Sequence, residues 1–293
     1  GNLSILAYEL QFIDVALSQL DHGSHVLLGY IVALTVLVQT IARRLVAIEP
    51  EVINLTFNRP SALLSSYIGA PDIRGARSAW DGQSVIDNHW MAYFTDMHHF
   101  RAMNRFNLVD VYALGGSGVG TFAPLAVTVT AAAQDWARRF LSTASGDTRE
   151  WIAVQAGASD IMKSWRPEYF GRALAHVSAQ WDGGIVLIGT PAEQNTIAQV
   201  VRAYREAGGQ SPVLNAAGKT TLEQLVGLLA ECRLLLTNDT GPMHLAVGVR
   251  IPVIDLSVGH VDFRETGPYG SGHWVIQPEL DCAPCGFDQV CAH

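Results

Sequence analysis

Short apolar runs alternate with amphipathic segments from residue 151 to residue 256. The apolar runs predict buried strands at 151–155, 184–189, 212–215, 234–236 and 251–256. Between them, apolar residues at helical spacing predict helices, the first beginning at Pro167 and another following the turn 190–193. A further helix precedes residue 232, with Thr220 and Glu223 as its expected capping box. Regular alternation of strand and helix predicts a parallel, doubly wound sheet whose ligand crevice lies at the carboxyl ends of its strands.

The first 150 residues show a less regular pattern. Helical spacing covers most of residues 1–50, Val52 to Leu55 predicts a buried strand, and helices are expected at 62–70 and 131–144. The run from Gly115 to Gly120 lacks the third glycine of a dinucleotide-binding motif, so a flexible turn is expected there. The polar segment after residue 144 is the expected linker, which predicts an N-terminal domain at 1–145 and a C-terminal domain at 146–293.

The most informative stretch runs from Leu234 to Leu256, where a strand leads directly into a short helix. Asp239 or Thr240 can cap this helix, and Pro242 suits its first turn. The free backbone N–H groups of a helix start, placed at the edge of a sheet, attract anions. Asp239 and His244 add an acceptor and a donor at the same place. An ordinary, well-capped βαβ unit remains the alternative interpretation.

Polar and small residues follow several of the other predicted strands. Because the carboxyl ends of parallel strands share one edge, these residues should converge there. They are Gly157, Ser159, Lys163, Gly189, Glu193, Asp239, Thr240 and His244. A Gly-Ala-Ser turn, a lysine and a helix start can cradle a diphosphate, and Glu193 is placed like the acids that hold ribose hydroxyls. Alternatively, Lys163 is a solvated loop charge and Glu193 an acid of a helix's first turn.

Composition narrows the class of protein. At 293 residues, 49% of them hydrophobic and 16% charged, the chain is long enough for two folded domains. The net charge of −8 and the absence of a basic patch argue against nucleic-acid binding, although not against a small anionic ligand. The apolar segment 26–38 is too short to span a bilayer and favours a buried helix. No secretory signal stands out, so a cytoplasmic location is expected.

Three of the four cysteines lie close together near the end of the sequence. Cys282, Cys285 and Cys291 form a C-x2-C-x5-C pattern. With His293 or a later residue as fourth ligand, they suit a structural zinc or iron site, and reduced thiols without metal are the alternative.

Several of these motifs together resemble glycosyltransferase family 9, the lipopolysaccharide heptosyltransferase-like enzymes. The similarity rests on AGAS…KSW, VLIGTPAE, KTTLEQLVGLLAECRLLLTNDTGPMHLA and TGPYG…CAPC, and extends more weakly upstream. The resemblance implies an α/β GT-B fold, with two Rossmann-like domains facing across a cleft. It also implies an inverting glycosyltransferase that takes heptose from ADP-heptose. The acceptor would be lipopolysaccharide or another surface glycan, reached by peripheral contact with the inner face of the membrane.

The resemblance also assigns roles to residues. Gly157, Ser159, Lys163, Gly189, Asp239, Thr240, Gly241 and His244 would surround the diphosphate and sugar of the donor, with Glu193 on the ribose and Thr221 and Leu222 near the base. Among these, Lys163, Asp239 and His244 are the expected catalytic residues. Because Lys163 and the helix start at 239–244 would stabilise the departing diphosphate, no cofactor is required for catalysis.

One departure from the family affects catalysis. The family has a Gly-Asp pair after its first strand, whose Asp resembles a general base, and no such pair occurs near the start of this sequence. Asp14 and Asp21 are the early carboxylates available, and the sequence resembles a copy that is incomplete at both ends. A catalytically degenerate nucleotide-sugar-binding subunit or scaffold is therefore the main alternative, and an epimerase on the same fold is a third.

Overall fold

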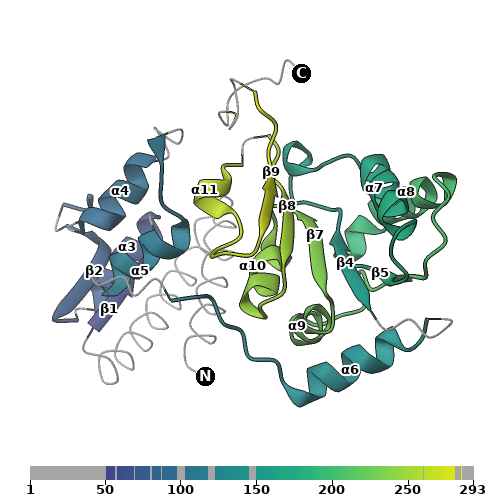
Figure 1. Ribbon diagram of the computed structural model, residues 1–293. Helices are drawn as coiled ribbons and strands as arrows, with labels where there is room; N and C mark the ends of the chain where they lie inside the picture. The colour runs from purple at the N-terminus through teal and green to yellow at the C-terminus, as the bar shows by residue number, and fades with distance from the viewer. Residues whose placement is uncertain are drawn as a thin grey trace, which may run out of the picture. The chain divides into compact units, whose positions relative to one another are not determined.

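The computed structural model describes residues 51–280 and 285, except residues 57, 69, 80, 87, 98–102, 118–122, 145–149 and 260. The chain forms two compact units. The first comprises the residues up to 95 together with 114–118, and the second comprises 96–113 and the residues from 119 onward. Figure 1 shows the elements of both.

The first unit contains a small mixed sheet. Strand β1 (Glu51–Asn54) pairs in parallel with β2 (Asp72–Ser78), which pairs antiparallel with β3 (Ser84–Ile86). Helix α3 (Arg59–Ile68) follows β1, and α4 (His89–Met97) follows β3. The predicted strand near residue 52 and the helix after it are therefore confirmed.

Helix α5 (Leu108–Ser117) includes residues for which a turn is expected. That prediction is wrong for Gly115 and Gly116, which belong to the last turn of the helix, while 118–120 lie outside the described residues. Gly115 is needed for close packing, because a Cβ there would lie 2.3 Å from the sulfur of Met91. Its carbonyl accepts a hydrogen bond from Asn88 Nδ2 at 2.8 Å.

The second unit is built on a parallel sheet of six strands in the order β6-β5-β4-β7-β8-β9. The strands are β4 (Trp151–Gln155), β5 (Gly184–Leu187), β6 (Val213–Asn215), β7 (Leu234–Asn238), β8 (Val253–Leu256) and β9 (Trp274–Ile276). Numbered along the unit, the order reads 3-2-1-4-5-6, the arrangement of a dinucleotide-binding fold. The predicted doubly wound sheet is confirmed, and β9 is an additional edge strand.

Helices cover both faces of this sheet (Figure 1). They are α6 (Ala131–Leu141), α7 (Pro167–Ser178), α8 (Gln194–Glu206), α9 (Leu222–Ala230) and α10 (Gly241–Gly248), with the short α11 (Phe263–Thr266) after β8. Alternate residues of a strand point to opposite faces. Trp151 and Ala153 accordingly pack with α6, α9 and α10, whereas Ile152 and Val154 pack with α7 and α8. Burial on both faces explains why these strands read as continuous apolar runs.

Helix α6 lies before the expected linker but belongs to the second compact unit. Its buried face, Ala133, Ala137 and Leu141, packs against α9, and Arg138 Nε forms an ion pair with Glu231 at 3.1 Å. Because residues 145–149 lie outside the described part, the domain boundary at residue 145 stays a prediction.

The capping box of α9 lies one residue later than the sequence predicts. Thr221 is the N-cap: its Oγ1 accepts from Gln224 N at 3.2 Å, and Gln224 Oε1 accepts from Thr221 N at 2.9 Å. The predicted partner Glu223 instead accepts a hydrogen bond from Thr130 Oγ1, which caps α6. Either Thr of this Thr-Thr pair satisfies the sequence pattern, so the pattern does not distinguish them.

Within the described part of the chain, every helix is too short or too polar to cross a bilayer.

The contact between α6 and α9 makes a testable prediction about Gly227. A Cβ at this position would lie 2.5 Å from the carbonyl oxygen of Ala133, so Gly227→Ala must push the helices apart. We expect a loss of about 1–3 kcal/mol in the free energy of unfolding, measured by urea denaturation followed by tryptophan fluorescence. Gly116→Ala is the matched control, because its Cβ would meet Ile53 at an ordinary 3.6 Å. Equal stability of the two variants would contradict the prediction.

Candidate functional site

A cavity of about 880 Å³ opens at the carboxyl ends of β4, β5, β6 and β7. This volume lies within the range of small-molecule sites. The predicted donor-binding residues that line it are Ser159, Lys163, Gly189, Glu193, Thr221, Leu222, Asp239, Thr240, Gly241 and His244. The other lining residues include Gln155, Ala158, Thr190, Pro191, Gly218, Thr220, Leu225, Pro242 and Thr266. Residues from widely separated parts of the sequence therefore meet at one site, although their roles remain predictions.

The fully buried side chain of Asn238, at the end of β7, organises the floor of the site. Its Nδ2 donates to the carbonyl of Ala156 at 2.9 Å, just after β4, and its Oδ1 accepts from the backbone N–H of Trp165 at 2.9 Å. The two segments that contain Ser159 and Lys163 are thereby tied to the strand that leads into α10. Lys163 itself closes the short helix η2 (Ile161–Lys163).

The start of α10 is open toward the cavity. Thr240, rather than Asp239, occupies the N-cap position, and its side chain makes no capping hydrogen bond. The Thr240 hydroxyl lies 3.2 Å from the hydroxyl of Thr237 instead. Gly241 has open space where a side chain would be, so a ligand can approach the backbone of the first turn closely. Pro242 has no N–H, and the Met243 N–H donates to the Thr240 carbonyl at 3.0 Å, so the N–H of Gly241 is the group of this turn that is placed to bind a phosphate.

Asp239 and His244 lie beside this helix start and influence each other's charge. Asp239 is only 8% exposed, and its Oδ2 accepts a hydrogen bond from Thr266 Oγ1 at 2.5 Å. Burial raises the pKa of Asp239, while the hydrogen bond from Thr266 and the charges of His244 and Lys163 oppose that rise. Burial lowers the pKa of His244, and the charge of Asp239 opposes that fall. A neutral imidazole keeps one N–H group, which can donate a hydrogen bond to an anionic ligand.

Glu193 is held firmly at the end of η3 (Pro191–Glu193). Its Oε2 accepts from the backbone N–H and the hydroxyl of Thr190, at 2.5 and 2.9 Å, and its Oε1 accepts from Gln155 Nε2 at 3.1 Å. Glu193 is therefore an acid in the first turn of a helix, as the alternative interpretation predicts, and it also lines the cavity. The ribose-binding role stays a prediction.

Gly157 does not line the cavity but lies against Glu193. A Cβ on Gly157 would come within 1.7 Å of Glu193 Oε1, so glycine is required for this packing. Its contribution to the site is therefore indirect: it makes room for a carboxylate that does line the cavity.

Some of the residues that line the cavity are apolar. Leu222 at the start of α9 is 69% exposed, and Leu225 and Pro191 also line this region. An exposed leucine next to the polar Thr220 and Thr221 offers a surface for a flat heterocycle. Thr221 and Leu222, which the resemblance places near the base, thus line the cavity at the start of α9, and their role in base binding stays a prediction.

Sequence reasoning missed Gln155, Asn238 and Thr266. Gln155 and Asn238 are polar residues that end otherwise apolar strands, a signal that the strand pattern contained. Thr266 gave no such signal, because its contact with Asp239 depends on a turn 27 residues later.

Several predicted residues lie outside the described part of the chain. They are Asp14, Asp21, Cys282, Cys291 and His293. Of the cysteine cluster only Cys285 is described, and its backbone N–H donates to the carbonyl of Gly259 at 3.1 Å. Among the described residues no group of three or more His, Cys, Asp or Glu could hold a metal ion. The zinc or iron site therefore stays a prediction.

The second unit combines a 3-2-1-4-5-6 sheet with a cavity next to β4 and β7, the two strands between which its order reverses. This combination defines a doubly wound α/β protein with a cavity at its topological switch point, where such folds bind their ligands. More narrowly, the chain belongs to glycosyltransferase family 9 (heptosyltransferase), whose sequence model matches residues 49–292.

Individual relatives agree with this assignment. The chain is 30% identical over 137 residues to lipooligosaccharide heptosyltransferase 2 of Campylobacter jejuni. The aligned region is 46% of this chain and 41% of that protein. The chain is 36% identical over 90 residues to lipooligosaccharide heptosyltransferase 2 of Haemophilus ducreyi, covering 31% of this chain and 25% of that protein. The chain thus spans less than half the length of these relatives.

Solved structures share the fold. The glycosyl transferase family 9 protein from Veillonella parvula superposes with a TM-score of 0.64 at 21% identity, over 82% of this chain and 66% of that chain. The E. coli ADP-heptose lps heptosyltransferase II superposes with a TM-score of 0.56 at 21% identity, over 82% of this chain and 72% of that chain. The predicted α/β fold of the GT-B heptosyltransferases is confirmed.

Asp255, next to the site on β8, provides a prediction about stability. It is fully buried, and neither carboxylate oxygen has a hydrogen-bond partner among the described residues. Burial, together with the charge of Asp239, raises its pKa to about 7. The folded protein then keeps a proton that the unfolded chain releases near pH 4, at about the ordinary pKa of Asp, so stability falls as pH rises from about 4 to about 7.

Asp255→Asn removes this titration. Relative to the original chain, the variant should gain roughly 2–3 kcal/mol of stability as pH rises from 5 to 8, because the pKa of about 7 lies about two pH units above the start of this range. Urea denaturation at each pH measures the gain. Asp182→Asn, at an exposed position, is the control and should change stability equally at both pH values. A constant difference between Asp255→Asn and the original chain from pH 5 to pH 8 would contradict the prediction.

Proposed function

We propose that the chain is an inverting glycosyltransferase that transfers heptose from ADP-heptose to a lipopolysaccharide core or a similar surface glycan. The observation that supports this most is the cavity at the switch point, which combines Lys163 with the open start of α10. A positive side chain and the open start of a helix, with the backbone N–H of Gly241, suit the diphosphate of a nucleotide sugar. Family membership supports the sugar-transfer reaction.

The heptose and adenine parts of the donor are inferred from the relatives. One matching structure is an ADP-heptose lps heptosyltransferase from E. coli, and another is the E. coli heptosyltransferase WaaC with ADP. In the proposed complex the diphosphate lies between Lys163 and Gly241, the ribose faces Glu193, and the base lies against Leu222. Asp239 then accepts a hydrogen bond from a hydroxyl group of the sugar.

The proposed reaction is a direct displacement at the anomeric carbon. The acceptor oxygen forms a bond to this carbon while the bond to the β-phosphate oxygen breaks, and ADP leaves. Negative charge grows on the departing diphosphate, where Lys163 and the α10 N–H groups stabilise it without a metal ion. The acceptor proton passes to a carboxylate base, for which Asp14 and Asp21 remain the candidates.

We further propose that the acceptor is reached at the inner face of the membrane by peripheral contact. The cysteines Cys282, Cys285 and Cys291 are proposed as a structural zinc or iron site, separate from the sugar transfer.

Binding of the nucleotide can be tested through Lys163. Lys163→Ala removes a charge-assisted hydrogen bond to the diphosphate and should weaken ADP binding by about 1.5–3 kcal/mol in isothermal titration calorimetry. Arg202→Ala, on the exposed side of α8, removes a positive charge away from the cavity and should leave the affinity unchanged. If Lys163→Ala binds ADP as tightly as the original chain, Lys163 does not contact the diphosphate.

Transfer itself is tested with ADP-heptose and a heptose-less lipopolysaccharide core, by following ADP release. We expect release that depends on the acceptor and falls by about 10²–10⁴-fold when Asp14→Asn or Asp21→Asn removes the base. Release unaffected by both changes would place the base elsewhere. Tight ADP-heptose binding without any release would favour the nucleotide-sugar-binding subunit over the transferase.

A further inference from the structure

The carboxylate of Asp239 lies in the cavity wall with one side occupied by protein. Thr266 Oγ1 donates a hydrogen bond to Asp239 Oδ2 at 2.5 Å, and both residues line the cavity. The sequence motifs of the donor site do not include Thr266. A carboxylate has two oxygens, so the contact with Thr266 leaves Asp239 Oδ1 as the oxygen available to a ligand.

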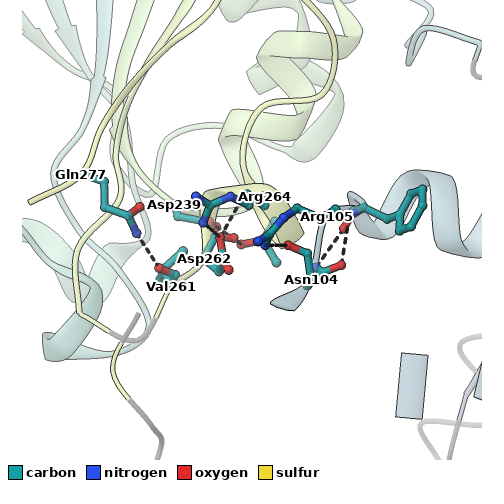
Figure 2. Close-up of polar contacts among 9 residues, drawn as sticks. Asn104, Arg105, Asp239, Val261, Asp262, Arg264 and Gln277 are labelled. Carbon is teal, nitrogen blue, oxygen red and sulfur yellow. Dashed lines mark hydrogen bonds and ion pairs between the residues drawn. The ribbon is translucent and has the colours of Figure 1, made fainter. Parts of the chain in front are cut away.

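Thr266 is itself held in place by the fold of α11. Asp262, which is fully buried, caps this helix: its Oδ1 accepts from Arg264 N at 2.9 Å, and its carbonyl accepts from Thr266 N at 3.0 Å. The Arg264 guanidinium also lies 3.6 Å from Asp262 Oδ1. Figure 2 shows Arg264 and Asp262 joined in this way, close to the labelled Asp239.

The segments on either side of α11 are anchored as well. Before it, the carbonyl of Val261 accepts a hydrogen bond from Gln277 Nε2 at 3.2 Å, which Figure 2 also shows. After it, the carbonyl of Gly267 accepts from Asn107 Nδ2 at 3.1 Å, and the hydroxyl of Tyr269 donates to Asp110 Oδ1. The Thr266 hydroxyl therefore has little freedom to follow a displaced Asp239.

We propose that Thr266 is a positioning residue that orients the Asp239 carboxylate so that Oδ1 accepts a hydroxyl group of the donor's sugar. This inference rests on the proposed function and makes Thr266 a determinant of specificity for the sugar rather than for the nucleotide. The proposed function places the diphosphate against Lys163 and α10, and in the described part of the chain the Thr266 hydroxyl bonds to Asp239 and Asp262 instead. The two parts of the donor are therefore separable by experiment.

The charges around Asp239 provide an additional readout. Lys163 on η2, His244 on α10, Asp255 on β8 and Glu265 on α11 all influence its surroundings. Because the hydrogen bond from Thr266 lowers the pKa of Asp239, its removal raises that pKa. The protonated acid accepts hydrogen bonds less well, so sugar binding should then be lost at a higher pH than in the original chain.

The test compares ADP and ADP-heptose binding to Thr266→Val and Thr266→Ser by calorimetry from pH 5.5 to pH 8. Valine has nearly the shape of threonine without the hydroxyl, and serine keeps the hydroxyl. Thr266→Val should weaken ADP-heptose binding about tenfold or more, as for a hydrogen bond to a charged group, and leave ADP binding unchanged. Thr266→Ser should restore ADP-heptose binding and the original pH dependence.

A double-mutant cycle with Asp239→Asn checks that the effect passes through Asp239. In the Asp239→Asn background, Thr266→Val should add little further loss, since the two residues act as one unit. Additive losses would overturn the inference, as would a Thr266→Val variant that binds ADP-heptose normally or loses ADP and ADP-heptose equally. If the original chain binds ADP-heptose no more tightly than ADP, the inference about Thr266 fails, but the proposed nucleotide site is still supported. If it binds neither ligand, the proposed function fails as well.

Discussion

The side-chain amide of Asn238 is the contact on which the candidate site depends. It links three segments that are distant in sequence: the end of β7, the turn after β4 at Ala156, and the chain entering α7 at Trp165. These links cross the point where the order of the sheet reverses, which is where a doubly wound fold has a crevice. Because Asn238 is fully buried, loss of either partner would leave a polar group unsatisfied in the core. This one side chain therefore helps to hold the segment that contains Lys163 next to the strand that leads into α10.

Some strands can be predicted from the sequence and others cannot, because the strands differ in how far their side chains are buried. Strands β4, β5 and β7 lie in the interior of the sheet and are covered on both faces, so each reads as an apolar run. The edge strand β9 was not predicted, because Trp274 and Ile276 are 60% and 58% exposed and the run is only three residues long. In the glycine-rich run, the sequence predicts a turn that the structure does not have at Gly115. This glycine instead lies in a helix and allows close packing against Met91.

The sequence predicts which residues line the candidate site, because the topology of the sheet brings them together. It does not predict the individual hydrogen bonds that hold them in place. Strand ends were enough to bring Lys163, Glu193 and Asp239 into one cavity, since parallel strands place their carboxyl ends together. The hydrogen bonds of Asn238 span 73 and 82 residues, and no spacing rule connects such partners. The shift of the α9 cap from Thr220 to Thr221 shows the same limit at short range, because both residues fit the pattern.

The acidic residues at the site explain how a chain with a net charge of −8 can accept an anionic ligand. Glu193 directs its carboxylate at Gln155 and Thr190 rather than into open space. Asp239 is hydrogen-bonded to Thr266, and burial raises the pKa of Asp255 to about 7, so that its negative charge is reduced near neutral pH. Protein hydrogen bonds or partial protonation thus reduce the negative charge that these acids present, while Lys163 and Gly241 line the cavity with a positive side chain and a helix start. The local field at the cavity is set by these few groups and not by the net charge, since charges beyond about 10 Å are screened by salt.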